Sequence, residues 1–398
     1  MKITHVISDS NIGGAGILLC RILKGLVSDY EQEVILPEGS ALTHKIPAGV
    51  RLTELPIAPD RSFRRSDINR LRIAIRSSAP QILHTHAALT ARIAGRLEGV
   101  PNLLSTRHCA KADVRRSPLY RTLYDRVTDL TVSTALFATR NLIREGVAPN
   151  KTVTIPNGSP DLSPPSPTER LEARARLGIG PEDFLLGSVA RLETVKGQDL
   201  MMEALARLLP AHPNMHLAIV GDGSAASLYH SLADELGIHH RVHFLGYLPD
   251  PAPIQALFDL NLNASRGTET TCLATSECMS LGIPTVASDF GGNPEMIRDG
   301  ECGLLFRNED VAALTDSIHR IYVDTDLYQH LAIGARRTYL SHFSERAMIS
   351  RYRLLYRSLA YKTPLPDLWS MINEQDDRSA LDENPAISND HDDIAANE

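Results

Sequence analysis

Short apolar runs alternate with amphipathic stretches through the first part of the chain. The run KITHVIS is followed by the glycine-rich turn DSNIGGAG and the amphipathic stretch ILLCRILKGLVSD, which predicts a strand, a turn and a helix. The order recurs through EVILP, a helix and buried strand ending at His84 and His86, and the segments ALTARIAGRLEGVPNLLSTRH and DLTVSTALFATRNLIREGVAPNKTVTIPNG. Continuous apolar strands joined by helices favour a parallel sheet covered on both faces.

A second series of the same kind follows a stretch rich in proline and serine. SPDLSPPSPTERLEARARLG has the composition of an interdomain linker. Strand-like and helix-like segments then alternate from FLLGSVAR to IPTVASDFGG, and SERAMISRYRLLYRSLAYK predicts a long helix after the second domain is complete. We therefore predict an α/β protein with two doubly wound, Rossmann-like domains at residues 1–165 and 166–345, a helix at 346–362, and a disordered tail at 363–398.

Length and composition agree with this division. A chain of 398 residues with 43% hydrophobic and 22% charged residues is typical of a globular protein of two or three domains. MKITHVISDS runs straight into a strand pattern, and no stretch approaches the roughly 20 apolar residues of a spanning helix, so we expect a cytoplasmic protein. The five cysteines are scattered in no zinc or thioredoxin pattern, and we expect free thiols.

Charge is unevenly distributed along the chain. The net charge is -7, yet residues 1–165 carry 22 Lys and Arg against 14 Asp and Glu, a net +8, which leaves -15 for the remainder. The tail from residue 363 holds 10 acids and one arginine. Nucleic-acid binding is disfavoured because aromatic residues make up only 5%, the isoelectric point is near 6.1, and no recognition motif is present.

Two cations stand at the end of a predicted strand in SVARLETVKGQDL. Arg191 and Lys196 precede a predicted helix N-terminus, and this combination suits a diphosphate. The alternative is a solvated basic loop.

Glycine-rich turns follow several other predicted strands. Gly13–Gly16 would let backbone N–H groups approach an anion or a sugar. This is not the dinucleotide fingerprint, because in a reading from Gly14 the third glycine position falls on Leu19. For the turns VGDGS, with Gly221, and FLGYL, with Tyr247, ordinary turn chemistry is the favoured interpretation when each is taken alone.

Two acids, Glu269 and Glu277, lie in RGTETTCLATSECMSLG with seven uncharged residues between them. If a helix begins near Cys272, Glu269 lies in the preceding loop and Glu277 more than a turn inside, with Thr270 and Thr271 as expected helix caps. Two carboxylates at this separation can hold two ends of one polyhydroxylated ligand. On spacing alone, an interpretation as capping or ion-paired acids is favoured over ligand binding.

The combination of these motifs resembles the retaining glycosyltransferases of family 4, which have the GT-B fold. SRGTETTCLATSECMSLGIPTVASDFGGNPEMIRDGECGLLF is similar to their E-x7-E motif followed by G-x-P-x-V-A-S and GG-x-x-E. ARLETVKGQDL resembles their Arg and Lys-Gly diphosphate loop, IVGDGS their donor-domain turn, IPNG the end of their first domain, and GGAG their N-terminal glycine loop. The resemblance covers about residues 1–345 and implies two domains facing a central cleft, with the late helix crossing back to the first domain.

The resemblance also implies a role for each matching residue. Arg191 and Lys196 would neutralise the donor diphosphate, and Glu277 would accept hydrogen bonds from the ribose hydroxyls. Glu269 would hold hydroxyls of the donor sugar, and His108 in STRH would sit over that sugar at the reaction centre. The other implied donor contacts are the backbone at Thr270, Thr271, Cys272 and Leu273, the glycine loop at Gly14 and Gly16, and the base-lining residues around Gly221 and Tyr247.

The chemistry implied is transfer of a sugar from a nucleotide-sugar with retention of anomeric configuration, without a metal or other cofactor. Cations and a helix N-terminus would stabilise the departing nucleoside diphosphate. The triplet DTD at residues 324–326 lies between helical stretches after the sugar site, so we do not expect it to bind a metal. Glu269 is followed by TTC, whereas many family members have an aromatic residue and a glycine there. This departure bears on the identity of the donor sugar more than on the activity. We interpret His84 and His86 as structural or acceptor-side residues.

The basic first domain should face the acceptor. RSFRRSDINRLRIAIR and KADVRRSPLYRTLYDR interleave arginines with Phe63, Tyr120 and Tyr124, which suits an anionic lipid surface at the inner face of the cell membrane, or a polyprenyl-linked or glycan acceptor. Solvated helix faces are the alternative.

These motifs bear on three candidate functions. The leading hypothesis is a glycosyltransferase of cell-surface polysaccharide or glycolipid assembly. The second is a catalytically silent nucleotide-sugar-binding assembly partner, which the joint presence of the donor-site residues disfavours. A nicotinamide-dependent dehydrogenase lacks the third glycine and the following ribose-binding acid.

Overall fold

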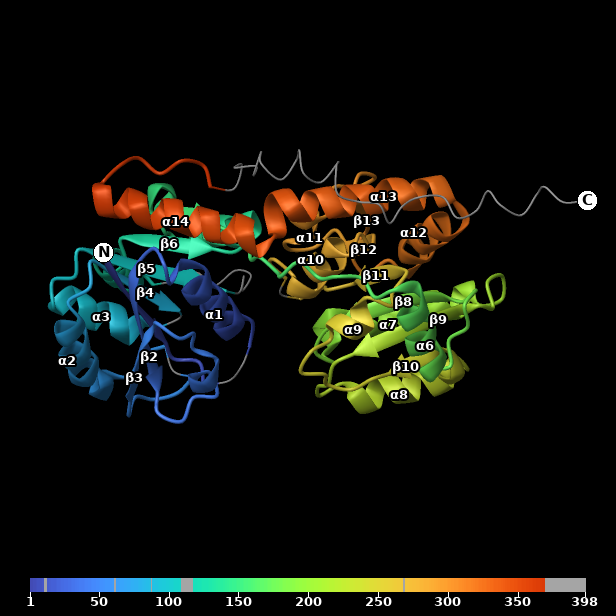
Figure 1. Cartoon of the computed structure of the whole chain (residues 1–398), viewed down its shortest axis with the longest axis horizontal. Helices are drawn as coiled ribbons and strands as arrows, with labels where there is room; N and C mark the ends of the chain where they lie inside the picture. Colours follow the sequence, from blue (N-terminus) through green and yellow to red (C-terminus); the bar gives the residue numbers. More distant parts are fainter. Residues whose placement is uncertain (11–12, 61, 87, 109–116, 268, 369–398) are drawn as a thin grey trace, which may run out of the picture.

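The computed structural model describes residues 1–10, 13–60, 62–86, 88–108, 117–267 and 269–368. These residues form two α/β lobes, each built on a parallel sheet with helices on both faces (Figure 1). The predicted fold class, two Rossmann-like domains with a C-terminal helix, is confirmed. The tail predicted to be disordered lies outside the described residues from residue 369 onward.

The first sheet has seven parallel strands in the order β3-β2-β1-β4-β5-β6-β7. Its strands are β1 (Lys2–Ile7), β2 (Glu31–Pro37), β3 (Arg51–Leu55), β4 (Ile82–His86), β5 (Asn102–Arg107), β6 (Leu130–Ser133) and β7 (Thr152–Thr154). Its helices are α1 (Gly14–Leu26), α2 (Ile68–Ser78), α3 (Leu89–Leu97), α4 (Pro118–Val127) and α5 (Leu136–Arg144). The strand order reverses between β1 and β4, so the crevice of this domain lies at their carboxyl ends.

The second sheet has six parallel strands in the order β10-β9-β8-β11-β12-β13. Its strands are β8 (Phe184–Val189), β9 (Met215–Val220), β10 (Val242–Phe244), β11 (Leu260–Asn263), β12 (Thr285–Ser288) and β13 (Gly303–Phe306). Its helices are α6 (Pro167–Arg176), α7 (Gln198–Leu208), α8 (Ala226–Glu235), α9 (Ala252–Gln255), α10 (Leu273–Ser280), α11 (Asn293–Met296), α12 (Val311–Val323) and α13 (Thr325–Thr338). Its reversal lies between β8 and β11.

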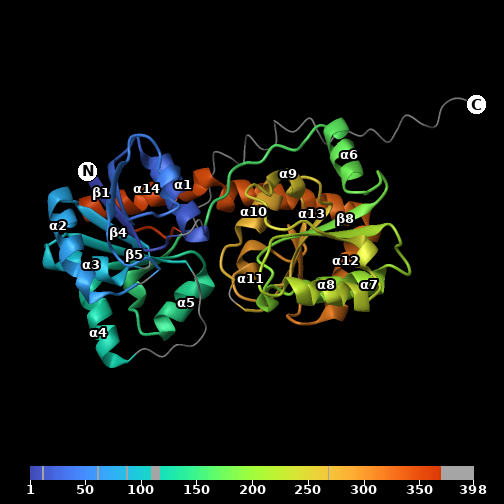
Figure 2. The ribbon, with the colours of Figure 1, turned by 90° about the horizontal axis from the view of Figure 1, so that it is seen from below.

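The last helix, α14 (Glu345–Tyr361), returns to the first domain. Tyr352 and Tyr356 are fully buried there and pack with Ile3, Leu104 and other apolar residues of the first sheet and α1. In Figures 1 and 2 α14 lies along the first lobe, although α13 lies against the second. Burial of large aromatic side chains therefore fixes the last helix to the domain where the chain began.

The two segments that cross between the lobes are hydrogen-bonded to each other. Ser159 donates its N–H to the carbonyl of Phe343 (2.9 Å) and accepts from the N–H of Glu345 (2.8 Å). The preceding residue must be small, because a Cβ at Gly158 would lie 2.5 Å from the carbonyl oxygen of Ser344. The linker and the start of α14 thus meet in one paired crossing.

Two local expectations are changed by the structure. The first helix was expected to begin after the glycine turn, but α1 begins at Gly14, so Gly14 and Gly16 belong to its first turn. A Cβ at Gly16 would lie 2.5 Å from the Leu42 side chain, so close packing accounts for this glycine. The strand β3 was missed because it is a half-exposed edge strand without a continuous apolar run.

Candidate functional site

A cavity of about 240 Å³ lies at the carboxyl edge of the second sheet. Its walls come from the ends of β8 and β11, the loop before α7, and the segment around the start of α10. The polar residues among those that line it are Ser188, Arg191, Lys196, Asn261, Asn263, Ser265, Glu269, Cys272 and Thr275. The structure therefore brings Arg191, Lys196, Glu269 and Cys272, which were predicted as site residues, to one place.

An ion pair joins the two halves of this cavity. The Nζ of Lys196 lies 2.7 Å from Oε2 of Glu269, and the hydroxyl of Ser265 donates to the same oxygen at 2.8 Å. The side chains of Lys196 and Glu269 are only 15% and 9% exposed. Burial disfavours the charged ammonium, but the Glu269 carboxylate outweighs this effect and raises the pKa of Lys196 above its ordinary value. The pair holds two opposite charges in position at the cavity wall.

Gly197 allows the lysine loop to approach the second sheet. The residue has a φ of 71°, in the left-handed region, and a Cβ there would lie 2.2 Å from the carbonyl oxygen of Ala264. Ala264 follows β11 directly, so the close approach brings Lys196 to the segment that carries Ser265 and Glu269. The Lys-Gly sequence thus has a steric explanation as well as a chemical one.

Arg191 lies at the same edge but is oriented differently. Its side chain is 69% exposed and its guanidinium pairs with Glu193, two residues further along the chain. Its backbone carbonyl accepts from the Nε2 of Gln198 (3.0 Å), which fixes the loop against the start of α7. The backbone of Arg191 is therefore anchored, and its exposed guanidinium pairs with Glu193 at the mouth of the loop rather than with a group inside the cavity.

The helix between the two acids begins where it was expected to begin. Cys272 is the N-cap of α10, so Glu269 lies in the preceding loop and Glu277 inside the helix. The capping role predicted for Thr270 and Thr271 is wrong, because no side chain caps this helix. The backbone N–H groups at the start of α10, beginning with Leu273, thus lie at a helix terminus without a side-chain cap, and such a terminus suits an anion.

The thiol of Cys272 lines the cavity. Burial, together with the Glu269 carboxylate, raises the pKa of Cys272 to about 11. The thiol is therefore protonated at neutral pH and acts as a small apolar surface in the wall. Cys20, Cys272, Cys278 and Cys302 are all free, as expected, and Cys109 lies outside the described residues.

Glu277 faces the first domain. Its Oε1 lies 3.5 Å from Nη2 of Arg21 on α1, and both side chains are 16% exposed. Burial raises the pKa of Glu277, although Arg21 and a hydrogen bond with Gln255 act in the opposite direction. Arg21 also donates to the carbonyl of Gly158 at 2.7 Å. Glu277, the predicted ribose contact, thus forms an ion pair that joins the two domains in this structure. The sequence did not reveal its partner Arg21, because that arginine lies inside an ordinary amphipathic helix pattern.

The two turns predicted to line the base follow neighbouring strands. Gly221 follows β9 with a φ of 140°, and a Cβ there would lie 2.0 Å from the carbonyl oxygen of Ala190. Gly221 donates its N–H to the carbonyl of Gly246 (2.8 Å), which places the turn after β9 beside the turn that holds Tyr247. The ring of Tyr247 is 69% exposed. These residues lie beside the cavity lining, at the next strand ends of the same sheet.

His108 lies in the first domain, directly after β5. Its ring is partly buried, and its Nε2 lies 3.1 Å from Nδ1 of His86. Burial lowers the pKa of His108 to about 4, so the imidazole is neutral at physiological pH. Gly14 and Gly16 belong to the same domain, in the first turn of α1, which follows β1.

Glu295 connects the two domains, and sequence reasoning missed its role. Its two carboxylate oxygens accept the backbone N–H groups of Leu136 and Phe137, at 2.6 and 2.5 Å, and so cap α5 of the first domain. Glu295 belongs to α11, which lies beside α5 in Figure 2. Burial raises the pKa of Glu295, and the two N–H groups act against this shift. Thr271 donates its hydroxyl to the carbonyl of Thr134 at the same boundary. The sequence did contain a signal for this role of Glu295. It is the acid at the end of GGNPE, which closely follows a predicted strand and a glycine pair.

The aromatic residues predicted to contact lipid differ in exposure. Phe63 is 52% exposed beside the exposed Arg64 and Arg65. Tyr124 is buried, with the Arg92 guanidinium 4.7 Å from its ring centre, so its predicted part in an exposed arginine-aromatic surface is wrong. Arg61, residues 109–116 and the Tyr120 side chain lie outside the described structure.

Within the described residues, one trio of histidines lies close enough together to share an ion. It consists of His5, His84 and His86, in the interior of the first domain. In the DTD triplet, Asp324 accepts from the N–H of Leu327 and caps α13. Asp324 thus has a structural role at a helix terminus.

Two family models match the chain, one on each domain. The model for Glycosyltransferase Family 4 matches residues 12–160, and the model for Glycosyl transferases group 1 matches residues 169–338. Together they cover the second sheet, the cavity and the first sheet from β2 onward, and they leave out β1, α14 and the tail.

Curated relatives match part of the chain. The D-inositol 3-phosphate glycosyltransferase of Corynebacterium aurimucosum is 30% identical over 258 residues, which are 62% of this chain and 60% of that protein. The lipopolysaccharide core biosynthesis glycosyltransferase LpsE of Rhizobium meliloti is 31% identical over 185 residues, which are 46% of this chain and 53% of that protein. The chain thus spans between half and three-fifths of the length of these relatives.

Solved structures share the fold over nearly the whole chain. HepE of Anabaena in complex with UDP has a TM-score of 0.76 and 22% sequence identity, and the match covers 90% of this chain and 100% of that one. A glycosyltransferase of Rickettsia africae has a TM-score of 0.79 and 17% identity, with 91% and 99% covered. At these identities the similarity shows the arrangement of the two domains.

Proposed function

Since this chain belongs to the family-4 glycosyltransferases of GT-B fold, we propose that it transfers a sugar from a nucleotide-sugar to a glycan or lipid-linked acceptor with retention of configuration. The observation that carries the proposal is the Lys196–Glu269 ion pair in the cavity of the second domain. A cation for phosphate and a carboxylate for sugar hydroxyls stand side by side there, next to the uncapped start of α10. HepE, whose structures contain UDP and UDP-glucose, supports a nucleotide-sugar as the donor.

The proposed reaction uses charge stabilisation by the protein. The diphosphate is the leaving group, and negative charge grows on its oxygens as the bond to the sugar breaks. Lys196, Arg191 and the first N–H groups of α10 are the positive groups near the cavity, and they would stabilise this charge without a metal. Glu269 would orient the sugar through its hydroxyls. The acceptor hydroxyl would attack from the face that the diphosphate leaves, and its proton would go to the departing phosphate oxygen.

Thermal-shift measurements with a panel of nucleotide-sugars and their free nucleotides test the proposal. A donor that binds the folded protein raises the melting temperature by mass action, and a concentration 100-fold above Kd adds about 2.7 kcal/mol. The active donor should then be hydrolysed slowly when no acceptor is present. Stabilisation without hydrolysis or transfer would instead favour the silent assembly partner, and no stabilisation by any nucleotide-sugar would reject the proposed donor site.

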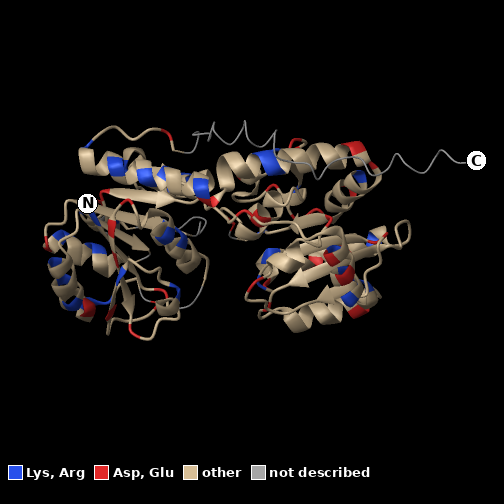
Figure 3. Ribbon diagram, in the orientation of Figure 1, with Lys and Arg blue, Asp and Glu red and all other residues tan. Residues whose placement is uncertain are grey.

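The acceptor is proposed to meet the first domain at an anionic membrane surface. Lys and Arg residues are spread over the helices of this lobe and along α14 (Figure 3). Three arginines of α2 are paired with acids, Arg70 with Asp67 and both Arg72 and Arg76 with Glu98. The exposed segment Phe63–Arg65 is therefore the part of this basic stretch best suited to lipid headgroups. Within the described structure, the helices are too short or too polar to cross a membrane.

Replacing Phe63, Arg64 and Arg65 together by serine is expected to weaken binding to vesicles of phosphatidylglycerol and phosphatidylcholine. The loss should be about tenfold or more, because each basic residue near an anionic surface contributes about 1 kcal/mol. Vesicle co-sedimentation measures the effect, and pure phosphatidylcholine vesicles should bind neither protein. Leu228→Ser, which removes a 54% exposed apolar side chain from the second domain, is the control. Equal binding by the triple variant and the wild type would reject this surface.

A further inference from the structure

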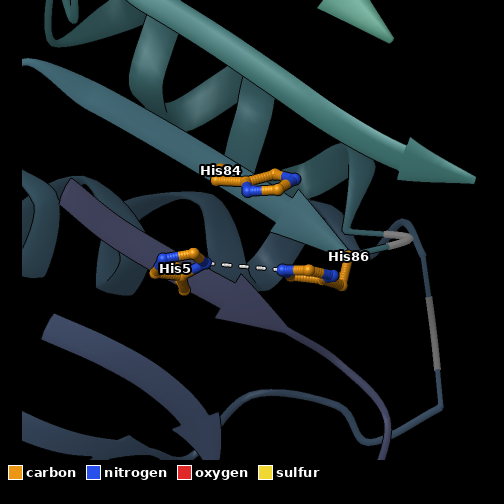
Figure 4. A group of neighbouring side chains, drawn as sticks. All are labelled: His5, His84 and His86. Atoms are coloured by element: carbon orange, nitrogen blue, oxygen red, sulfur yellow. Dashed lines mark hydrogen bonds between the residues drawn. The ribbon is translucent and has the colours of Figure 1, made fainter. Parts of the chain in front are cut away.

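A buried cluster of imidazoles lies directly behind His108. His5 comes from β1, and His84 and His86 come from the adjacent β4, where His5 pairs in register with His84 (Figure 4). Their side chains are at most 1% exposed. Buried polar rings require hydrogen-bond partners, so their bonding pattern shows what the cluster does.

The hydrogen bonds of the cluster run outward to His108. Nδ1 of His5 lies 3.5 Å from Nε2 of His86, the contact drawn in Figure 4, and Nδ1 of His86 lies 3.1 Å from Nε2 of His108. The rings of His86 and His108 are stacked at 23° with centroids 5.3 Å apart. Three imidazoles therefore form one chain, and His108 is its end in the first-domain crevice.

His84 belongs to a separate set of bonds. Its Nδ1 lies 2.7 Å from the hydroxyl of Tyr356 on α14, and its Nε2 lies 2.6 Å from the hydroxyl of Thr106. Both nitrogens of His84 are thus engaged, as are both nitrogens of His86. A metal shared by His5, His84 and His86 would have to break these bonds, so the geometry favours a hydrogen-bonded network over a metal site.

The three hydrogen-bonded imidazole rings, those of His5, His86 and His108, are neutral at physiological pH. Burial lowers the pKa of His5 to about 3, and burial together with the neighbouring imidazoles lowers the pKa of His86 well below its ordinary value. The pKa of His108 is lowered as well, to about 4. A neutral imidazole carries one N–H and one acceptor nitrogen. Each contact in the chain therefore needs one donor and one acceptor, and the position of one proton fixes all the others.

Two arrangements of the ring protons give each contact between the three histidines one donor and one acceptor. In one, His86 donates from Nδ1 to His108, and the proton of His108 is on Nδ1. In the other, His108 donates from Nε2, and His5 must carry its proton on Nε2. That nitrogen of His5 is buried and has no hydrogen-bond partner among the described residues. Buried N–H groups without an acceptor are rare, so the first arrangement is preferred.

We propose that His86 is a positioning residue that holds His108 as the Nδ1–H tautomer, so that His108 offers a hydrogen-bond donor to an oxygen of the donor sugar. The inference rests on the proposed role of His108 in the glycosyltransferase site. His86 itself does not touch the substrate. The neutral His108 ring presents its one proton on Nδ1. The order of donors and acceptors is His5 to His86 to His108 to sugar.

The full-length protein labelled with ¹⁵N at histidine tests the tautomer directly, without any substrate. The ring nitrogens of His108, assigned by comparison with His108→Gln, should show a protonated Nδ1 and an unprotonated Nε2. In His86→Leu this preference should be lost. In His86→Asn it should be kept, because the asparagine amide can donate from nearly the position of the histidine Nδ1. A proton on Nε2 of wild-type His108, or an unchanged tautomer in His86→Leu, would overturn the proposal.

A matched control distinguishes the loss of the positioning contact to His108 from the general effect of removing a buried histidine. His216 is 4% exposed in the second domain, and its Nδ1 lies 2.9 Å from Nε2 of His243, the same pair of atoms as in the His86–His108 contact. His216→Leu should lower the melting temperature but leave the His108 signals unchanged. Addition of equimolar Zn²⁺ to the wild type should leave the His5, His84 and His86 signals in place, and their joint shift would overturn the hydrogen-bonded arrangement.

Donor turnover gives a second readout once a donor is known. Mutation of residues that orient a metal-ligating histidine from behind typically changes activity by about 10- to 100-fold, and we expect an effect of this size for the contact of His86 with His108. His86→Leu should therefore lower kcat for donor hydrolysis by about tenfold with KM little changed, and His86→Asn should recover most of it. If no nucleotide-sugar is turned over, the proposed function fails, yet the tautomer measurement still decides the inference.

Discussion

Donor turnover should fall by about two to three orders of magnitude when Lys196 is replaced by methionine. Removing one preorganised positive group from a site where negative charge develops typically has this effect. Methionine keeps the length of the side chain and removes the charge, so the loop at Gly197 can stay in place. The kcat for hydrolysis of the donor identified by thermal shift is the measurement. A loss of less than about fivefold would show that Lys196 does not serve the diphosphate.

The same variant should also be less stable, because it leaves the Glu269 carboxylate without its cation in a site where only 9% of that side chain is exposed. Breaking a fully buried pair costs about 3–5 kcal/mol, and partial exposure of Lys196 reduces this to about 2 kcal/mol. Glu269→Gln should be destabilising as well. The double variant Lys196→Met with Glu269→Gln should recover most of the stability and none of the activity, because no unpaired charge remains. Recovery of both together would mean that the pair is structural only.

The sign of the pH dependence follows from the raised pKa of Lys196. A cation whose pKa is higher in the folded than in the unfolded protein stabilises fully below the unfolded value, near 10.4, and loses this effect as pH rises through the folded value. The stability difference between wild type and Lys196→Met should therefore be constant from about pH 7 to pH 9 and decrease only above about pH 10. Urea unfolding across this range measures it.

Replacing Glu295 by alanine should weaken the contact between the two domains and let them move apart. The variant leaves the N–H groups of Leu136 and Phe137 without their carboxylate and removes a negative charge from the start of α5. Two hydrogen bonds to a charged acceptor, exchanged for water in the open form, favour closure by about 2 kcal/mol, or about thirtyfold in population. Small-angle scattering should show a larger radius of gyration, and transfer to an acceptor should fall by about tenfold or more.

The controls for Glu295 separate closure from donor binding. The melting-temperature increase caused by free nucleotide should be nearly unchanged in Glu295→Ala, because the cavity lies within the second domain. Glu301→Ala, which removes an acid of the same domain that is 58% exposed and paired with Arg298, should leave scattering and transfer unaltered. An unaltered scattering profile in Glu295→Ala would reject the capping contact as a determinant of closure.

The alternation of buried strands with amphipathic helices was enough to predict two parallel sheets, because strands covered on both faces read as continuous apolar runs. The same rule explains the miss at β3, whose half-exposed residues Arg51–Leu55 have no such run. The start of α10 at Cys272 was also predicted, but the capping by Thr270 and Thr271 was not correct. Thr271 instead bonds to Thr134 of the other domain, and no local pattern contains that partner.

The sequence by itself determined the fold class, the loop that carries Arg191 and Lys196, and the two acids around one helix start, because these depend on periodicity and on motifs within about 20 residues. The tertiary structure alone decided which groups meet. It paired Lys196 with Glu269, turned Glu277 toward Arg21, placed Glu295 at the N-terminus of α5, and set His86 behind His108. These contacts join residues 22 to 256 positions apart in the chain. Their energies depend on distance and burial in the folded protein, which local sequence does not specify.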